Sequence, residues 1–225
     1  HPELDIKHAY NAAQKQYTVS IEQVQDLKEF PLYRIPMAID VYYGGAVERH
    51  QIELTEKEQS FSFDVLGEPA LVNVDAEKML LGVKNETKTN EQYIFQLKEA
   101  PLFLDRFEAL EGLKKTNDAA ATAAMIETLE DPFWGIRKKA LQTLKGRAVA
   151  DTSLLKNRLI WMAQKDEKSA VRAEALAMLA SEFGRDKNVQ DVIKAALKDR
   201  SYAVAGASLR SIAEFDKDAA LSAAS

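Results

Sequence analysis

The sequence contains no cysteine, which excludes disulfide bonds, thiolate zinc sites and a cysteine nucleophile. It also has no run of about 18 apolar residues, so no membrane-spanning helix is expected. The Gly-x-Ser-x-Gly, phosphate-loop and Gly-x-Gly-x-x-Gly patterns are all absent. No residue pattern in the chain therefore indicates a catalytic centre or a nucleotide site.

The chain also lacks an excess of positive charge, because 30 Lys and Arg residues stand against 35 Asp and Glu residues, and the acidic excess falls in residues 1–100. Neither half of the chain is basic enough to indicate a nucleic-acid partner, and the acidic half would repel a phosphate backbone. Hydrophobic residues make up 46 % of the 225 residues and charged residues 29 %. This composition is typical of a soluble protein of one or two domains, in the cytoplasm or the periplasm.

The three histidines, His1, His8 and His50, do not form a recognisable metal site. No pair is spaced i, i+4, and no H-E-x-x-H pattern occurs. A zinc site needs three or four convergent ligands. We therefore expect no metal ligand and no catalytic residue in this chain, and we interpret the histidines as strand-face or surface residues.

Residues 1–86 show the two-residue alternation of half-buried strands, as in Tyr17, Val19 and Ile21. The expected strands are centred on 4–10, 17–23, 37–43, 47–54, 61–65, 71–74 and 79–83. Gly44-Gly45 predicts a hairpin turn with positive φ angles. About seven short strands with these turn signals predict a β-sandwich domain over residues 1–86.

From about residue 87 the apolar residues follow helical spacing, which predicts an all-α domain over residues 87–225. Thr89-x-x-Gln92 resembles a capping box and opens a pair of junction helices over about 89–113. Trp134 and Trp161 fall in or beside apolar helical faces, where we expect packing between repeats.

A sequence motif, which we call the repeated phrase, begins at Asp131, Asp166 and Asp199 in the helical half. Its spacing of about 34 residues is typical of stacked helical hairpins. The corresponding positions of the three copies are Asp131 with Arg137, Asp166 with Arg172, and Asp199 with Ala205 in place of arginine. We interpret them as a structural ladder in which each Asp caps a helix and each Arg bridges to the Asp of an adjacent repeat. Binding of a ligand carboxylate by the arginines stays open as an alternative.

The three phrases resemble HEAT repeats, so the expected helical domain is an α-α superhelix. The order of sandwich and repeats resembles the C-terminal half of aminopeptidase N-like zinc metallopeptidases, the gluzincin aminopeptidases. The segments that carry the resemblance are His1–Ile6, Pro36–Tyr42, Phe61–Asp64, Pro69–Asp75, Glu91–Leu97 and Leu104–Leu110. Residues 79–83 depart from the family, and its H-E-x-x-H helix and downstream Glu are absent, so no catalytic or zinc residue carries over.

The resemblance implies a non-catalytic scaffold and gate of a zinc-dependent aminopeptidase that removes N-terminal residues from peptides. It implies zinc in the parent protein and no cofactor in this chain. The implied partners are the catalytic domain of the same polypeptide and peptide substrates, with no nucleic acid and no membrane. The chain lacks an initiator Met at His1 and reaches Ser225 within a helical pattern, so we expect a piece of a longer protein.

The alternative is a catalytically inactive protein-interaction module related to the large TATA-binding-protein-associated factor, whose junction resembles residues 91–113. An H-E-x-x-H pattern upstream of His1 would favour the enzyme, and its loss would favour the module.

Overall fold

The structure is a computed structural model that describes residues 1–224, with side chains to residue 223. Two compact units are present, His1–Leu113 and a second that begins at Lys114. The secondary structure changes from strands to helices between Glu86 and Asn90, whereas the units divide after Leu113. The first unit therefore contains the strands together with the first two helices.

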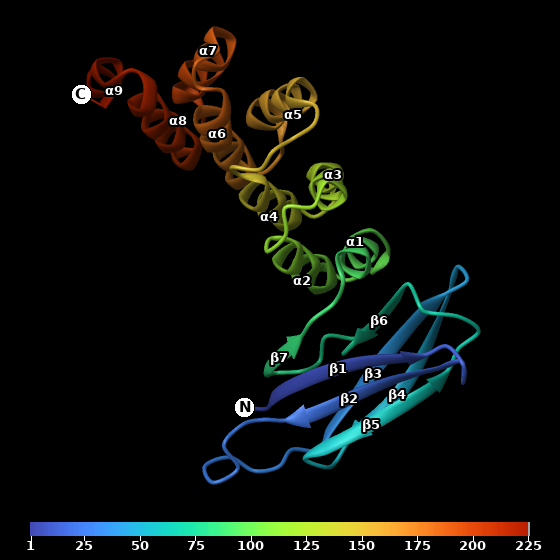
Figure 1. Cartoon of the computed structure of the whole chain (residues 1–225). Coiled ribbons are helices and arrows are strands. Elements are labelled where there is room, and N and C mark those ends of the chain that lie inside the picture. Colours follow the sequence, from blue (N-terminus) through green and yellow to red (C-terminus); the bar gives the residue numbers. More distant parts are fainter. Residues whose placement is uncertain (225) are drawn as a thin grey trace. The chain divides into compact units, whose positions relative to one another are not determined.

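The described residues contain seven strands in two sheets (Figure 1). They are β1 (Glu3–Asn11), β2 (Gln16–Gln23), β3 (Ile35–Tyr43), β4 (Ala46–Leu54), β5 (Glu58–Asp64), β6 (Leu71–Val74) and β7 (Val83–Glu86). One sheet has the order β5-β2-β1-β7 and the other β4-β3-β6. Neighbouring strands are antiparallel except β1 and β7, which pair in parallel.

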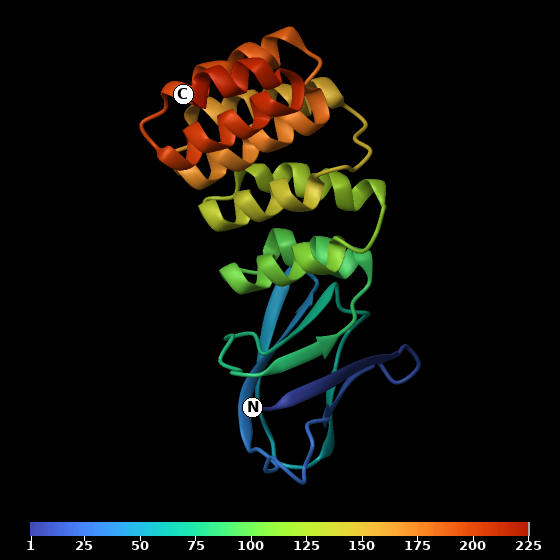
Figure 2. The ribbon, with the colours of Figure 1, turned by 90° about the vertical axis from the view of Figure 1, so that its left-hand side faces the viewer.

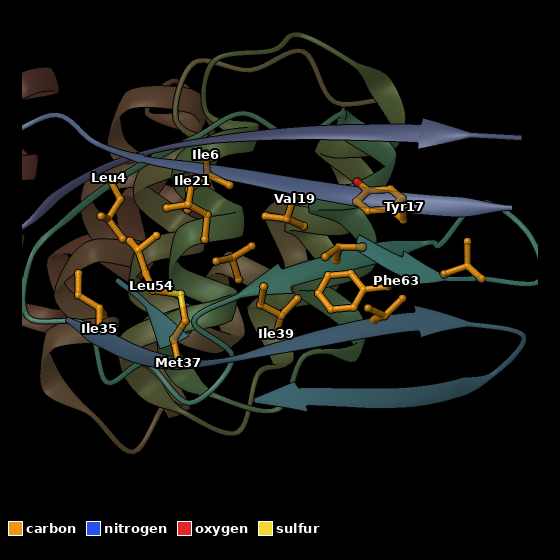
Figure 3. Packing of buried hydrophobic residues seen from close by; sticks show 14 residues of the cluster. Leu4, Ile6, Tyr17, Val19, Ile21, Ile35, Met37, Ile39, Leu54 and Phe63 are labelled. Atoms are coloured by element: carbon orange, nitrogen blue, oxygen red, sulfur yellow. The ribbon is translucent and has the colours of Figure 1, made fainter. Parts of the chain in front are cut away.

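The inward side chains of both sheets form one hydrophobic core (Figure 3). Leu4 and Ile21 come from the first sheet, and Ile39 and Leu54 from the second, and all four are fully buried. Alternate residues along β2 are buried, as the two-residue period predicted. The strand half is therefore a two-layer sandwich.

The prediction of a strand over residues 79–83 is wrong, because the seventh strand is β7. The carboxylate of Asp75 accepts hydrogen bonds from the backbone N–H groups of Met79 at 2.9 Å and Leu80 at 3.3 Å. These bonds anchor Met79 and Leu80 to the turn at residues 75–77 and not to a sheet, and Met79 is 71 % exposed. The chain joins the sheet at Val83, where β1 supplies a partner strand.

The described residues contain nine α-helices and two short 3-10 helices. The α-helices are α1 (Asn90–Glu99), α2 (Phe103–Leu113), α3 (Ala119–Glu127), α4 (Trp134–Leu144), α5 (Thr152–Lys165), α6 (Ser169–Phe183), α7 (Lys187–Ala195), α8 (Tyr202–Phe215) and α9 (Lys217–Ala224). The 3-10 helices are η1 (Thr128–Glu130) and η2 (Ala196–Lys198). The predicted capping box is confirmed, because the Thr89 and Gln92 side chains bond reciprocally to each other's backbone N–H.

In the second unit α4, α6 and α8 contact one another in series (Figures 1 and 2). The other layer consists of α3, α5 and α7, and each of these helices contacts the one that follows it. Each pair is too small to bury its apolar face alone, so stability comes from neighbouring pairs. Across residues 1–224, no helix combines the length and apolar character that crossing a membrane would require.

Candidate functional site

The arginines of the repeated phrase bridge successive hairpins of the second unit. Arg137 on α4 donates from Nε and Nη2 to the two carboxylate oxygens of Asp166, at 2.8 and 2.9 Å. Arg172 on α6 makes the same pair of bonds to Asp199, at 3.0 and 2.9 Å. Each Nη1 donates to the backbone carbonyl six residues earlier, that of Asp131 or Asp166. The structure thus brings the five residues together in one series.

The three aspartates of this series do not occupy the N-cap position, so that part of the prediction is wrong. The N-caps of α4, α6 and α8 are Phe133, Lys168 and Ser201. Each Asp accepts a hydrogen bond from the backbone N–H of the residue two positions later, at 2.8 to 2.9 Å. This is an Asx turn, and each Asp also ends the preceding helix. The chain consequently needs two more residues before it enters the next helix.

The ladder is largely buried and electrostatically satisfied. The side chains of Arg137 and Asp166 are 11 % and 2 % exposed. The hydrogen bond to Asp166 raises the pKa of Arg137 despite partial burial. The hydrogen bond from Arg172 lowers the pKa of Asp199. Both guanidinium groups use all three nitrogens on protein acceptors, which favours the structural role over capture of a ligand carboxylate.

An open depression of about 570 Å³ lies beside the ladder, lined in part by Arg158, Trp161 and Lys165 of α5. Trp161 is 54 % exposed, so the expected packing between repeats is wrong for this residue. The buried positions of α5 include Leu155 and Leu159, and Trp161 lies outside that stripe. Arg158 pairs with Glu130 of η1, so the depression carries charges of both signs.

A second cluster, which sequence analysis missed, is a chain of ion pairs inside the first unit. We call it the buried ionic chain, and its members are His8, Lys78, Lys84, Glu86, Lys88, Asp105 and Glu108. The Nζ atom of Lys78 lies 2.9 Å from Asp105 Oδ1 and 3.0 Å from Glu108 Oε2. Lys84 lies 3.2 Å from the same Glu108 oxygen and 3.5 Å from Glu86. Glu86 accepts from Lys88 at 2.6 Å and contacts His8 at 2.8 Å.

Opposite charges compensate one another along the buried ionic chain. Burial by itself would raise the pKa of Glu86, but Lys88, the His8 hydrogen bond and Lys84 hold it well below its usual range. Burial lowers the pKa of Lys88, with Glu86 opposing the change. Burial would also lower the pKa of Lys84, but Glu86 and Glu108 raise it above its usual value. Three ammonium groups thus face three carboxylates.

The buried ionic chain connects α2 to the strands, because Asp105 and Glu108 lie on α2 and Glu86 lies on β7. This connection is a physical reason for α1 and α2 to belong to the first unit. No sequence signal pairs Lys78 or Lys84 with a carboxylate 24 to 30 residues later. The pairing depends on how α2 folds back on the sandwich.

Within the described residues, no group of three or more His, Cys, Asp or Glu side chains could hold a metal ion. The histidines have separate surroundings. His8 bonds to Glu86, His50 lies 4.4 Å from the Phe63 ring between centroids, and His1 lies 3.7 Å from Glu3. The side chains present therefore do not fit a catalytic zinc ion.

No protein-family model matches the sequence, and no curated protein matches it. Among solved structures, Legionella pneumophila aminopeptidase A in complex with aspartic acid is similar, with a TM-score of 0.71 and 12 % sequence identity. The match covers 99 % of this chain and 32 % of the aminopeptidase chain. The chain thus spans about a third of that protein's length, and its seven strands and following helices share the fold of part of an aminopeptidase.

Proposed function

We propose that this chain is the non-catalytic sandwich and HEAT-like repeat region of a zinc-dependent aminopeptidase. The observation that carries the proposal is the structural match over 99 % of this chain to a third of an aminopeptidase. The serial contacts of α4, α6 and α8, bridged by the Arg–Asp ladder, support an α-α superhelix of HEAT-like repeats. The zinc and its ligands belong, in this proposal, to the catalytic domain.

The proposed role is that of a scaffold and gate. A helical domain packed against a catalytic domain encloses the active site, limits which peptides reach it and excludes water. The ladder suits this role, because bidentate Arg–Asp bridges fix the position of each helical hairpin relative to the next. The chain itself supplies no chemistry in this role.

The test starts from the DNA that encodes this chain. The reading frame upstream of His1 should encode an H-E-x-x-H helix followed by a Glu ligand. The upstream segment is then expressed alone and with this chain supplied as a separate polypeptide. We expect the two to bind, and peptidase selectivity among peptides of increasing length to change on binding. The isolated chain should hydrolyse no aminoacyl reporter substrate.

Two results would overturn the proposal. Tight stoichiometric zinc on the isolated chain, with peptidase activity that survives purification, would contradict the absence of a catalytic role. An upstream segment without zinc ligands, or with the same selectivity in both conditions, would contradict the gate. In that case the related interaction module becomes the better interpretation.

A further inference from the structure

A pocket of about 370 Å³ in the first unit lies between the β3–β4 hairpin and α1. Its aromatic walls are Tyr42, Tyr43 and Phe95, and the rings of Tyr42 and Phe95 meet edge to face with centroids 5.6 Å apart. Val47 adds an apolar side chain that is 54 % exposed. Tyr42 is buried, whereas Tyr43 and Phe95 are partly exposed. An accessible aromatic face is suited to an apolar stem and to a cation above it.

The two turn residues of the hairpin line the same pocket with backbone alone. Gly44 and Gly45 have φ angles of +58° and +78°, which confirms the predicted positive-φ turn. A Cβ atom built on either glycine would meet no atom within 4 Å. The turn therefore leaves the pocket open to solvent, where a ligand can enter.

The polar groups at this pocket are acceptors or neutral. Glu99, the last residue of α1, lines the pocket and forms no ion pair within the described part of the chain. It lies at the negative end of the helix dipole, where a cation is favoured. The Tyr42 hydroxyl likewise makes no hydrogen bond among residues 1–224. The described residues that line the pocket include no lysine or arginine.

Most of the charged groups that act on the pKa of Tyr42 are carboxylates. Burial raises the pKa of its phenol, and the carboxylates of Asp40 and Asp105 raise it further. Glu99 acts in the same direction, and Arg49 opposes it. The Arg49 guanidinium is held on Asp40 by two bonds of 2.7 and 2.8 Å and also pairs with Glu77, so its hydrogen bonds are directed at those carboxylates and not at Glu99.

We propose that this hairpin pocket binds an organic cation, a primary ammonium group on an unbranched alkyl stem such as a lysine side chain. The stem lies between Phe95, Tyr43 and Val47, and the ammonium group reaches Glu99 and the Tyr42 hydroxyl. Partly exposed aromatic rings and one exposed carboxylate, that of Glu99, recognise this chemistry without any metal or cofactor. The proposal is independent of the parent enzyme.

The test is an NMR titration of the full chain, labelled with ¹⁵N, with Nα-acetyl-lysine methylamide. The matched neutral probe is Nα-acetyl-norleucine methylamide. We expect saturable shifts at residues 42–47 and 95–99, with the neutral probe bound at least about threefold more weakly. Glu99→Gln should weaken binding of the lysine probe about twofold to fivefold, and Phe95→Leu should weaken both probes.

The control variant is Glu91→Gln, which removes an exposed carboxylate from the other end of the same helix. It should leave the affinity unchanged. Equal binding of the two probes, equal effects of the Glu99→Gln and Glu91→Gln variants, or shifts spread outside the pocket would each overturn the proposal.

Discussion

Replacing Lys78 by methionine removes one charge from the buried ionic chain while keeping a long unbranched side chain. The Lys78 side chain is 6 % exposed, and its ammonium group lies 2.9 Å from Asp105 and 3.0 Å from Glu108. Asp105 is fully buried. The variant therefore leaves a carboxylate in the interior without its nearest cation.

Breaking a buried ion pair from one side costs about 3–5 kcal/mol. Asp105 keeps hydrogen bonds from the Asn73 side chain at 2.9 Å and the Leu102 backbone N–H at 3.2 Å. We therefore expect a loss near the lower limit, about 3 kcal/mol in the free energy of unfolding of the first unit. A domain of this kind is stable by about 5–15 kcal/mol, so the loss is easily measured.

The assay is urea unfolding followed by circular dichroism, with hydrogen exchange of the α2 amides to locate the change in the first unit. The matched control is Lys28→Met, which removes an exposed lysine from the loop between β2 and β3. The double variant Lys78→Met/Asp105→Asn should regain part of the loss, because no buried charge is left unpaired. Equal stability of the Lys78→Met and Lys28→Met proteins would refute the reasoning.

Three further predictions concern both units. Arg137→Met should lower the free energy of unfolding by about 3 kcal/mol and Arg172→Met by about 1–2 kcal/mol, because the partner Asp166 is 2 % exposed and the partner Asp199 is 20 % exposed. Urea unfolding of the two variants measures both losses, and a larger loss for Arg172→Met would contradict the prediction. Gly82→Ala should lower the free energy of unfolding by about 1–3 kcal/mol, since a Cβ atom there overlaps the Pro2 carbonyl. Thermal melting measures the loss, and Gly67→Ala is the control because a Cβ atom at Gly67 faces open space. Burial raises the pKa of Tyr17 to about 12. The buried neutral phenol therefore contributes fully to the stability of the fold below about pH 10, and this contribution is lost as pH rises through about 12. Tyr17→Phe should reduce the loss of stability between about pH 9 and 11, measured by urea unfolding at both pH values.

Local features of this fold could be predicted from the sequence because their physical cause lies within a few residues. A two-residue period reflects the pleat of a strand, and a 3.6-residue period reflects one helical face. The Thr89–Gln92 capping box and the Gly44-Gly45 turn are of this kind, since each is determined by neighbours in the chain. The repeated phrase also made the stacking of helical hairpins predictable, because self-similarity indicates such stacking without any knowledge of contacts.

Other features depended on partners distant in sequence, and the tertiary structure alone decided them. Residues 79–83 form a short, mainly apolar run that predicts a strand, yet the chain pairs with β1 only from Val83 onward. Trp161 is apolar but points away from the stripe that α5 buries. From the sequence alone Lys78 would be assigned to the surface, but in the structure α2 folds back and places the carboxylates of Asp105 and Glu108 beside it. The local pattern determines which elements form, and long-range packing determines which charges and rings become neighbours.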